Sequence, residues 1–392
     1  MKKSTLLASI LLPMVTFSQS FIQTYQDRAN DVTQNNITTL LQEFENLGVK
    51  TTGNEANNNT REWIKNKYLS FGYSEDQISE HTFSFSRQGQ TVSSKNLILT
   101  KTGTVYPNQF VIICGHFDSI VGPGTNDNGT GTSIILEVAR ILKEVPTEYS
   151  IKFINFSGEE QGLLGSYAYV DDIVNATSPK MDIKVVFNID EVGGIAGQDN
   201  SIIYCDVDQS SPYANNSASS EMAHQLAAVT ELYSDLETDF DPAYGTDYVP
   251  FQENGEIITG FFEYHYSPYA HSMQDVLENL DQEYVYQIAK AAVGAAQHFA
   301  IASSENLSTS NLSTNALESI KIYPNPAKDV LHFQIDESKL SDFSIEIHDL
   351  SGRFLMEKKS DSKIDISSLK SGNYLVTIRL KGEKINKKII VE

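Results

Sequence analysis

The pattern of apolar and polar residues changes once along the chain, and the change predicts two kinds of domain. Up to about residue 302, segments with the spacing of amphipathic helices alternate with short apolar runs. Such alternation is typical of a mixed, mainly parallel sheet flanked by helices, so we predict an α/β domain here. Helices are expected at residues 37–44, 61–69, 133–143, 221–228 and 282–298, and strands at 96–100, 110–114, 151–156 and 185–189.

The pattern after residue 302 predicts a linker and then a second, all-β domain. Residues 303–319 are rich in Ser, Thr and Asn and contain too few apolar side chains to bury a core. Residues 320–392 contain short alternating apolar runs separated by Gly, Asn, Asp or Ser, with no helical period between them. We therefore expect a small antiparallel β-sandwich after the linker.

The first residues have the three parts of a signal peptide. Two lysines follow Met1, an apolar stretch covers residues 6–17, and small or polar residues come next. The apolar stretch is shorter than the roughly 20 residues that a membrane-spanning helix needs, and no later segment approaches that length. We expect residues 1–19 to be removed on export, residues 20–302 to form the α/β domain, and the mature chain to have no transmembrane segment.

Charge and cysteine content narrow the possible functions. The net charge of −22 is uneven, because residues 1–318 carry 16 basic and 40 acidic side chains, whereas residues 319–392 carry 13 and 11. A nucleic-acid partner is not expected, since phosphate binding requires clustered positive charge. Cys114 and Cys205 are the only cysteines, and each lies in an apolar run. We interpret both as packed thiols, with a single bridge between them as the alternative.

Two adjacent glutamates, Glu159 and Glu160, follow the strand expected at residues 151–156 and precede a turn of small residues. Open α/β sheets bind their ligands at the carboxyl ends of their strands. Because neighbouring side chains diverge, the two glutamates are expected to differ in role. One would ligate a metal, and the other would transfer a proton to or from a metal-bound water.

Two further candidates follow the strand expected at residues 110–114. His116 comes first, and Asp118 lies on the same face of an extended segment, where it can accept a hydrogen bond from the imidazole.

A glycine-rich stretch at residues 122–131 contains Asp127. A phosphate-binding loop is the alternative interpretation of this stretch. The stretch lacks the Gly-Lys-Ser/Thr ending of such a loop, and Asp127 would repel phosphate. Asp127 can cap the following helix or, as a ligand, bridge two cations.

Asp190 and His271 complete the candidate set. Asp190 directly follows the strand expected at residues 185–189, and His271 lies shortly before the final helix. A pair of metal ions needs carboxylates and imidazoles that converge from several strand ends. The candidate residues are His116, Asp118, Asp127, Glu159, Glu160, Asp190 and His271.

Five ordered segments resemble the motifs of secreted bacterial dizinc aminopeptidases of the leucyl type. They are GHFDS at 115–119, NDNGTG at 126–131, FSGEEQGLLGS at 156–166, FNIDEVG at 187–193 and AHSMQDV at 270–276. The resemblance covers about residues 30–302 and implies the zinc-exopeptidase, phosphorylase/hydrolase-like α/β fold with two Zn2+ ions as cofactors. It departs at residues 246–251, where the usual Ser-Asp-His before Pro-Phe appears as Thr-Asp-Tyr.

This resemblance implies a role for each ligand. Asp127 is expected to bridge the two zinc ions, with His116 and Asp190 completing one site and Glu160 and His271 the other. Glu159 is expected to be the general base and acid. Asp118 is expected to be a second catalytic residue on the ground of its spacing, which allows a hydrogen bond to His116. A cis peptide bond is implied between Asp127 and Asn128.

The end of the chain carries a second resemblance. IYPNPAKD at 322–329, Ser-Gly at 351–352 and LKSGNY at 369–374 are similar to the C-terminal sorting domains of type IX secretion substrates. The implied route leads through the periplasm and then across the outer membrane by the type IX machinery, to a secreted or cell-surface protein. A carbohydrate-binding or adhesion sandwich is the alternative.

The function expected from these features is hydrolysis of the N-terminal residue from peptides that have a free N-terminus. A hydroxide held between the zinc ions would attack the carbonyl, while Glu159 transfers the proton. A carboxypeptidase or dipeptidase and a glutaminyl cyclase of the same fold are alternatives. A non-catalytic cell-surface binding protein is a further alternative, although such a protein would not need Glu159.

Overall fold

The structure is a computed structural model that describes residues 20–176, 178–304, 321–334, 343–348, 354–359, 361–380 and 383–391. The predicted signal peptide lies outside the described residues, as does the predicted linker apart from residues 303 and 304. The chain divides into two compact units, Met1–Glu305 and Asn306–Glu392.

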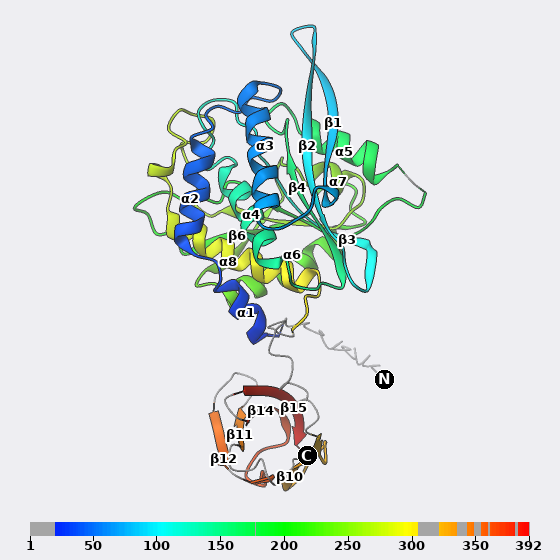
Figure 1. The fold of residues 1–392 in the computed structure, drawn as a ribbon, viewed down its shortest axis with the longest axis vertical. Coiled ribbons are helices and arrows are strands. Elements are labelled where there is room, and N and C mark those ends of the chain that lie inside the picture. The colour runs from blue at the N-terminus through cyan, green and yellow to red at the C-terminus, as the bar shows by residue number, and fades with distance from the viewer. Residues whose placement is uncertain are drawn as a thin grey trace, which may run out of the picture. The chain divides into compact units, whose positions relative to one another are not determined.

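The first unit is built on an eight-stranded sheet with the order β1-β2-β4-β3-β5-β8-β6-β7 (Figure 1). The pairs β4-β3, β3-β5, β5-β8 and β6-β7 are parallel, and the other three are antiparallel. The prediction of a mixed, mainly parallel sheet is confirmed. The strands are β1 (Ile78–Arg87), β2 (Gln90–Lys101), β3 (Tyr106–His116), β4 (Tyr149–Phe156), β5 (Asp182–Ile189), β6 (Ile202–Val207), β7 (Glu237–Pro242) and β8 (Ile258–Glu263).

Helices cover both faces of this sheet. Alternate residues of the central strands face opposite ways, so Ile113 and Phe187 join one hydrophobic cluster whereas Ile112 and Val186 join another. Helices α1, α2, α3, α4, α6 and α8 contribute to the first cluster, and α5 and α7 to the second. The helices are α1 (Gln23–Ala29), α2 (Gln34–Glu45), α3 (Glu55–Ser70), α4 (Gly129–Leu142), α5 (Leu164–Tyr169), α6 (Asn216–Tyr233), α7 (Val249–Glu253) and α8 (Gln282–Phe299).

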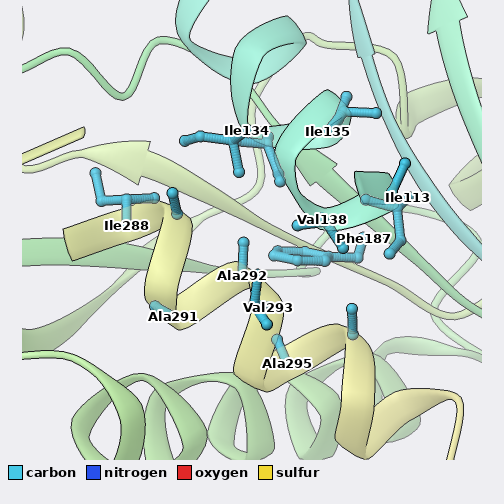
Figure 2. Packing of buried hydrophobic residues seen from close by; sticks show 14 of the residues in the cluster. Ile113, Ile134, Ile135, Val138, Phe187, Ile288, Ala291, Ala292, Val293 and Ala295 are labelled. Atoms are coloured by element: carbon cyan, nitrogen blue, oxygen red, sulfur yellow. The ribbon is translucent and has the colours of Figure 1, made fainter. Parts of the chain in front are cut away.

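Phe187 lies at the centre of the larger cluster, between the sheet and helices α4 and α8 (Figure 2). Its ring makes edge contacts with Phe261 at 5.2 Å and Phe299 at 5.8 Å between centroids. Helix α8 is rich in small residues and has a glycine, Gly294, where it meets the ring of Tyr233. A Cβ atom at Gly294 would lie 2.5 Å from that ring, so only glycine allows this close packing of α8 against α6.

The two cysteines lie on opposite faces of the sheet. Cys114 on β3 belongs to the smaller cluster and Cys205 on β6 to the larger one, and both are buried free thiols. The prediction of packed thiols is confirmed. The bridge left open by the sequence does not form, because the sheet itself separates the two side chains.

The second unit contains two antiparallel sheets, with orders β13-β10-β9 and β12-β11-β14-β15. Leu331 and Phe333 from one sheet and Ile345, Val376 and Ile378 from the other belong to one hydrophobic cluster, as expected for a small sandwich. The strands are β9 (Lys321–Tyr323), β10 (Val330–Gln334), β11 (Phe343–His348), β12 (Phe354–Lys359), β13 (Lys363–Asp365), β14 (Gly372–Leu380) and β15 (Glu383–Val391).

Within the described residues, no helix combines the length and the apolar character needed to cross a bilayer.

Replacing Phe187 with alanine is expected to destabilise the first unit by about 3–5 kcal/mol, because it removes a fully buried ring and leaves a cavity between the sheet and α8. Urea denaturation followed by tryptophan fluorescence would measure the loss, since the single tryptophan, Trp63, packs against the same cluster. Tyr213→Ala is the control, because Tyr213 is 73% exposed and its loss is expected to change stability by less than about 0.5 kcal/mol. Equal stability of the two variants would contradict this description of the core.

Candidate metal centre and active site

The seven candidate residues lie together at one edge of the sheet, where the neighbouring strands β4, β3 and β5 end. His116 is the last residue of β3 and pairs with Phe156, the last residue of β4. Asp190 follows β5 directly, and Glu159 lies three residues beyond Phe156. Because parallel strands present their carboxyl ends at the same edge, segments far apart in the sequence meet there.

His116 is oriented so that one ring nitrogen is free to bind a metal. Its Nδ1 lies 3.2 Å from the backbone carbonyl oxygen of Asp118. A carbonyl oxygen only accepts hydrogen bonds, so Nδ1 carries the proton and Nε2 retains a lone pair. Nε2 lies 3.1 Å from Oδ1 of Asp127 and 3.3 Å from Oδ1 of Asp190. These three residues form the first candidate ligand group.

Asp118 contacts the site differently from the expected hydrogen bond between its carboxylate and His116. The carboxylate lies 3.7 Å from Nδ1 of His116, farther than the backbone carbonyl of the same residue. It accepts hydrogen bonds from Oγ1 of Thr52 at 2.9 Å and from the backbone N–H of Glu159 at 3.3 Å. Asp118 therefore orients the imidazole through its main chain and holds the segment of Glu159 through its side chain.

His271 and Glu160 form a second candidate ligand group with Asp127. Nε2 of His271 lies 3.1 Å from Oδ2 of Asp127 and 2.9 Å from Oε2 of Glu160. The two carboxylate oxygens of Asp127 thus face two different histidines. His271 is 56% exposed and has a left-handed backbone conformation with φ +54°, so this group lies at the more open side of the site.

The residues present fit a pair of zinc ions. Each group offers one imidazole nitrogen and two carboxylate oxygens, and zinc binds these donors while leaving a position for water or substrate. Oδ1 of Asp190 is buried and has no hydrogen-bond donor among the described residues, as expected of an oxygen available to a metal. Its other oxygen, Oδ2, accepts a hydrogen bond from Oγ1 of Thr246 at 2.6 Å.

The acidic groups of the site change one another's ionisation. Burial raises the pKa of Glu159 to about 10, and the nearby Asp190 adds to that rise. Burial also raises the pKa of Glu160 to about 8, with a further contribution from Asp127. For His116, burial lowers the pKa, but the charges of Asp190 and Glu159 raise it well above its usual value. These directions reflect closely spaced buried negative charge, which a bound cation would stabilise.

Glu159 belongs to neither ligand group. Its Oε2 lies 4.0 Å from Nε2 of His116, so the carboxylate lies beside the first group. A carboxylate in this position can exchange a proton with a molecule bound between the ligand groups.

The peptide bond between Asp127 and Asn128 is cis, as the resemblance implied. Asn128, and not Asp127, caps helix α4, because its side-chain oxygen accepts a hydrogen bond from the backbone N–H of Gly131 at 2.8 Å. The capping role considered for Asp127 is therefore taken by its neighbour, and both oxygens of Asp127 face the histidines.

Asp275 supports the site, although sequence reasoning gave it no role. Its Oδ1 accepts a hydrogen bond from the backbone N–H of Asn126 at 2.6 Å, and its Oδ2 accepts one from the backbone N–H of Asp127 at 3.0 Å. Because Asp275 lies four residues after His271, it joins the segment that contains His271 to the segment that contains Asp127. The only signal in the sequence was its position inside the AHSMQDV motif.

The segment that departs from the family pattern, residues 246–251, is buried beside the first ligand group. The hydroxyl of Tyr248 donates a hydrogen bond to Asp206 at 3.1 Å and accepts one from the backbone N–H of Tyr244 at 2.8 Å. Tyr248 is therefore a packing residue within the smaller hydrophobic cluster of the first unit, the one that contains Cys114.

An α/β sheet whose strand ends carry two histidine–carboxylate groups around one shared aspartate defines a candidate dimetal enzyme. Residues 96–296 match the model of Peptidase family M28. Because this match covers half of the chain, the chain belongs to that family. Residues 321–392 match the model described as a secretion system C-terminal sorting domain, which indicates secretion or attachment at the cell surface.

Curated relatives and solved structures agree with this assignment. The chain is 30% identical over 213 residues to aminopeptidase YwaD of Bacillus subtilis, covering 52% of this chain and 44% of the relative. It is 31% identical over 169 residues to a probable leucine aminopeptidase 2 of Aspergillus fumigatus, covering 42% of this chain and 32% of the relative. The chain thus spans less than half the length of these curated relatives.

Two solved structures share the fold at low sequence identity. An aminopeptidase from Aneurinibacillus sp. strain AM-1 superimposes with a TM-score of 0.61 at 15% identity, covering 71% of this chain and 96% of that one. A glutaminyl cyclase from Macrostomum lignano superimposes with a TM-score of 0.60 at 17% identity, covering 74% of this chain and 94% of the cyclase. Fold alone therefore does not separate these two activities.

Replacing Asp275 with asparagine is expected to weaken zinc binding roughly 10- to 100-fold, because the amide retains only one acceptor for the two backbone N–H groups that hold the loop of Asp127. Competition with a chromophoric zinc chelator would measure the affinity. Asp199→Asn is the matched control, because it removes one exposed acidic charge outside the site. Zinc affinity equal to that of the wild type would contradict the supporting role of Asp275.

Proposed function

We propose that this protein is an exported zinc-dependent aminopeptidase, which removes N-terminal residues from peptides that have a free N-terminus. The observation that carries the proposal is the geometry of Asp127, whose two oxygens face His116 and His271, with Glu159 beside but outside both groups. Membership of the peptidase family and the names of the curated relatives support the same activity.

The ligand groups suggest an assignment for two zinc ions. Asp127 would bridge them, with His116 and Asp190 completing one site and Glu160 and His271 the other. When bound, the ions would supply Lewis acidity to the peptide carbonyl and to the attacking water. Zinc chemistry is supported by the family and by the donor set, and the presence of two ions is part of the proposal.

The remaining residues would transfer protons and hold the ligand residues in place. The carboxylate of Glu159 would take the proton of the attacking water and return it to the nitrogen of the leaving amine. Its Oε2 lies 4.0 Å from Nε2 of His116, beside the first ligand group, where the attacking water would be held. Asp118 holds the backbone of Glu159, and Thr246 holds the carboxylate of Asp190, so both segments are in place before the substrate binds.

The export route is a second part of the proposal. We infer that residues 1–19 are a signal peptide, residues 20–302 the catalytic domain, residues 303–319 a linker, and residues 320–392 a sorting domain for the type IX secretion machinery. The match of residues 321–392 to a sorting-domain model supports this organisation.

Glu159→Gln is expected to retain zinc and to lose roughly 100- to 10,000-fold in kcat, because the amide keeps the shape of the side chain but cannot accept the proton. Turnover of leucine p-nitroanilide and zinc content by atomic emission would be measured on the same preparation. Glu144→Gln, at a side chain that is 84% exposed, is the control and should match the wild type. A fully zinc-loaded Glu159→Gln variant with wild-type turnover would contradict the proposed base.

Removal of zinc with a chelator is expected to abolish release of p-nitroaniline from leucine p-nitroanilide, and added zinc to restore it. The N-acetylated substrate should resist cleavage under all conditions, since an aminopeptidase requires a free amine. On peptides with free termini, cleavage at the carboxyl terminus would indicate a carboxypeptidase. On peptides that begin with glutamine, cyclisation of that residue would indicate a glutaminyl cyclase. Either result, without release of free N-terminal residues, would replace the proposed activity.

A further inference from the structure

Glu159 and Glu160 lie on one loop, residues 157–165, which leaves β4 and enters the first turn of α5. Its turns include left-handed backbone conformations at Gly158 and Leu163, with φ of +82° and +60°. The backbone N–H of Leu163 donates a hydrogen bond to the carbonyl oxygen of Glu159 at 2.8 Å. Because the loop folds back on itself in this way, the position of both carboxylates depends on where its two ends are held.

Asn96 on β2 holds both ends of this loop. Its Oδ1 accepts a hydrogen bond from the backbone N–H of Ser157 at 3.1 Å. Its Nδ2 donates a hydrogen bond to the carbonyl oxygen of Gly165 at 2.8 Å. Asn96 is fully buried, so water does not compete for these contacts. One side-chain amide thus joins the first residue of the loop to the last.

The two ends of the loop also pack directly against each other. A Cβ atom at Gly165 would lie 2.1 Å from the carbonyl oxygen of Ser157 and 2.4 Å from Oδ1 of Asn96. These separations are shorter than a van der Waals contact, so only glycine fits at this position. Gly165 therefore allows the two ends to lie close enough for one amide to reach both.

The orientation of the Asn96 amide follows from its partners. A backbone N–H only donates and a carbonyl oxygen only accepts, so the amide oxygen faces Ser157 and the amide nitrogen faces Gly165. Nδ2 also donates to Nδ1 of His81 at 3.2 Å, which leaves the proton of the imidazole on Nε2. That Nε2 donates to Oδ2 of Asp172 at 3.2 Å. Both hydrogens and the oxygen of the amide are thus hydrogen-bonded.

We propose that Asn96 is a positioning residue, whose amide keeps Glu159 beside the first ligand group by holding both ends of its loop. The inference rests on the proposed role of Glu159 as the base. The loop needs such a restraint because it also brings an oxygen of Glu160 within 4.8 Å of one of Asp127. Like charges this close repel one another and push the loop outwards unless hydrogen bonds or cations oppose them.

The test uses the full chain with Asn96→Leu, which keeps about the same side-chain size and removes the hydrogen bonds to both loop ends. At saturating zinc, kcat for leucine p-nitroanilide is expected to fall about 10- to 100-fold with KM nearly unchanged, because misplacing a catalytic group by about 1 Å costs rate on this scale. Wild-type kcat in the folded, zinc-loaded variant would overturn the inference.

A double variant separates positioning from a merely structural role. If Asn96 acts through Glu159, adding Asn96→Leu to the zinc-loaded Glu159→Gln variant should lower kcat by less than about 3-fold further, because effects of residues that act together are not additive. A second loss as large as that in the wild-type background would show that Asn96 does not act through Glu159. That result would overturn the inference.

Gly165→Ala disturbs the same two loop ends without changing Asn96. The added methyl group forces Gly165 away from the carbonyl oxygen of Ser157, so kcat is expected to fall as it does in Asn96→Leu. This variant carries the test if Asn96→Leu does not fold. Wild-type kcat in Gly165→Ala would then overturn the inference.

Asn215→Leu is the matched control, because it removes a buried amide at the other edge of the sheet. Nδ2 of Asn215 donates to Oδ2 of Asp208 at 3.2 Å and to the carbonyl oxygen of Glu256, before β8, at 2.6 Å. The control should lower the melting temperature and keep the wild-type kcat. An equal loss of kcat in the control would reduce the effect of Asn96 to general destabilisation and overturn the inference.

Zinc affinity distinguishes failure of the inference from failure of the proposed function. Asn96→Leu is expected to weaken zinc binding about 10-fold in competition with a chromophoric chelator, since Glu160 lies on the same loop. If the zinc-loaded wild type released no amine from any substrate, the proposed function would fail. Zinc affinity equal to that of the wild type would then overturn the role of Asn96 as well.

Discussion

The concentration of buried carboxylates around His116 is the constraint on which the rest of the catalytic unit depends. Asp127 and Asp190 lie within 3.3 Å of its Nε2, and Glu159 lies within 4.0 Å. Closely spaced charges in a buried site repel one another strongly unless cations and hydrogen bonds offset them. The sheet keeps these groups together because β4, β3 and β5 end at one edge, and the hydrophobic clusters on both faces hold those strands in register.

Segments from other parts of the chain keep the ligands in place. Thr246 binds Asp190, Asp275 binds the backbone of Asp127, and the carbonyl of Asp118 orients His116. The loop before Asp127 is also held by Lys50, whose buried Nζ donates hydrogen bonds to the carbonyl oxygens of Gly48 and Pro123. These contacts align the ligands before any metal binds, which is how supporting residues raise the affinity and the precision of a metal site.

Much of the fold could be predicted because strong periodic signals lie where the core is densest. The predicted strand at residues 185–189 lies within β5, and the predicted helix at 282–298 matches α8 to within one residue. The long hairpin of β1 and β2 was predicted only at its inner end, residues 96–100, because its outer part carries few apolar residues and buries only part of one face. Helices α5 and α7 were missed because each is too short to show a helical period.

The sequence by itself determined which residue types follow each strand, and so which side chains were candidates for a metal centre. It also determined the change from an α/β unit to an all-β unit, since hydrophobic periodicity is a local property. Only the tertiary structure decided the contacts. The carbonyl of Asp118 reaches His116 in place of its carboxylate, Cys114 and Cys205 face opposite sides of the sheet, and Asp275 holds a loop about 150 residues earlier in the chain. Such contacts depend on how strands and loops meet in space, and hydrogen-bond partners at long range leave no periodic signal in the sequence.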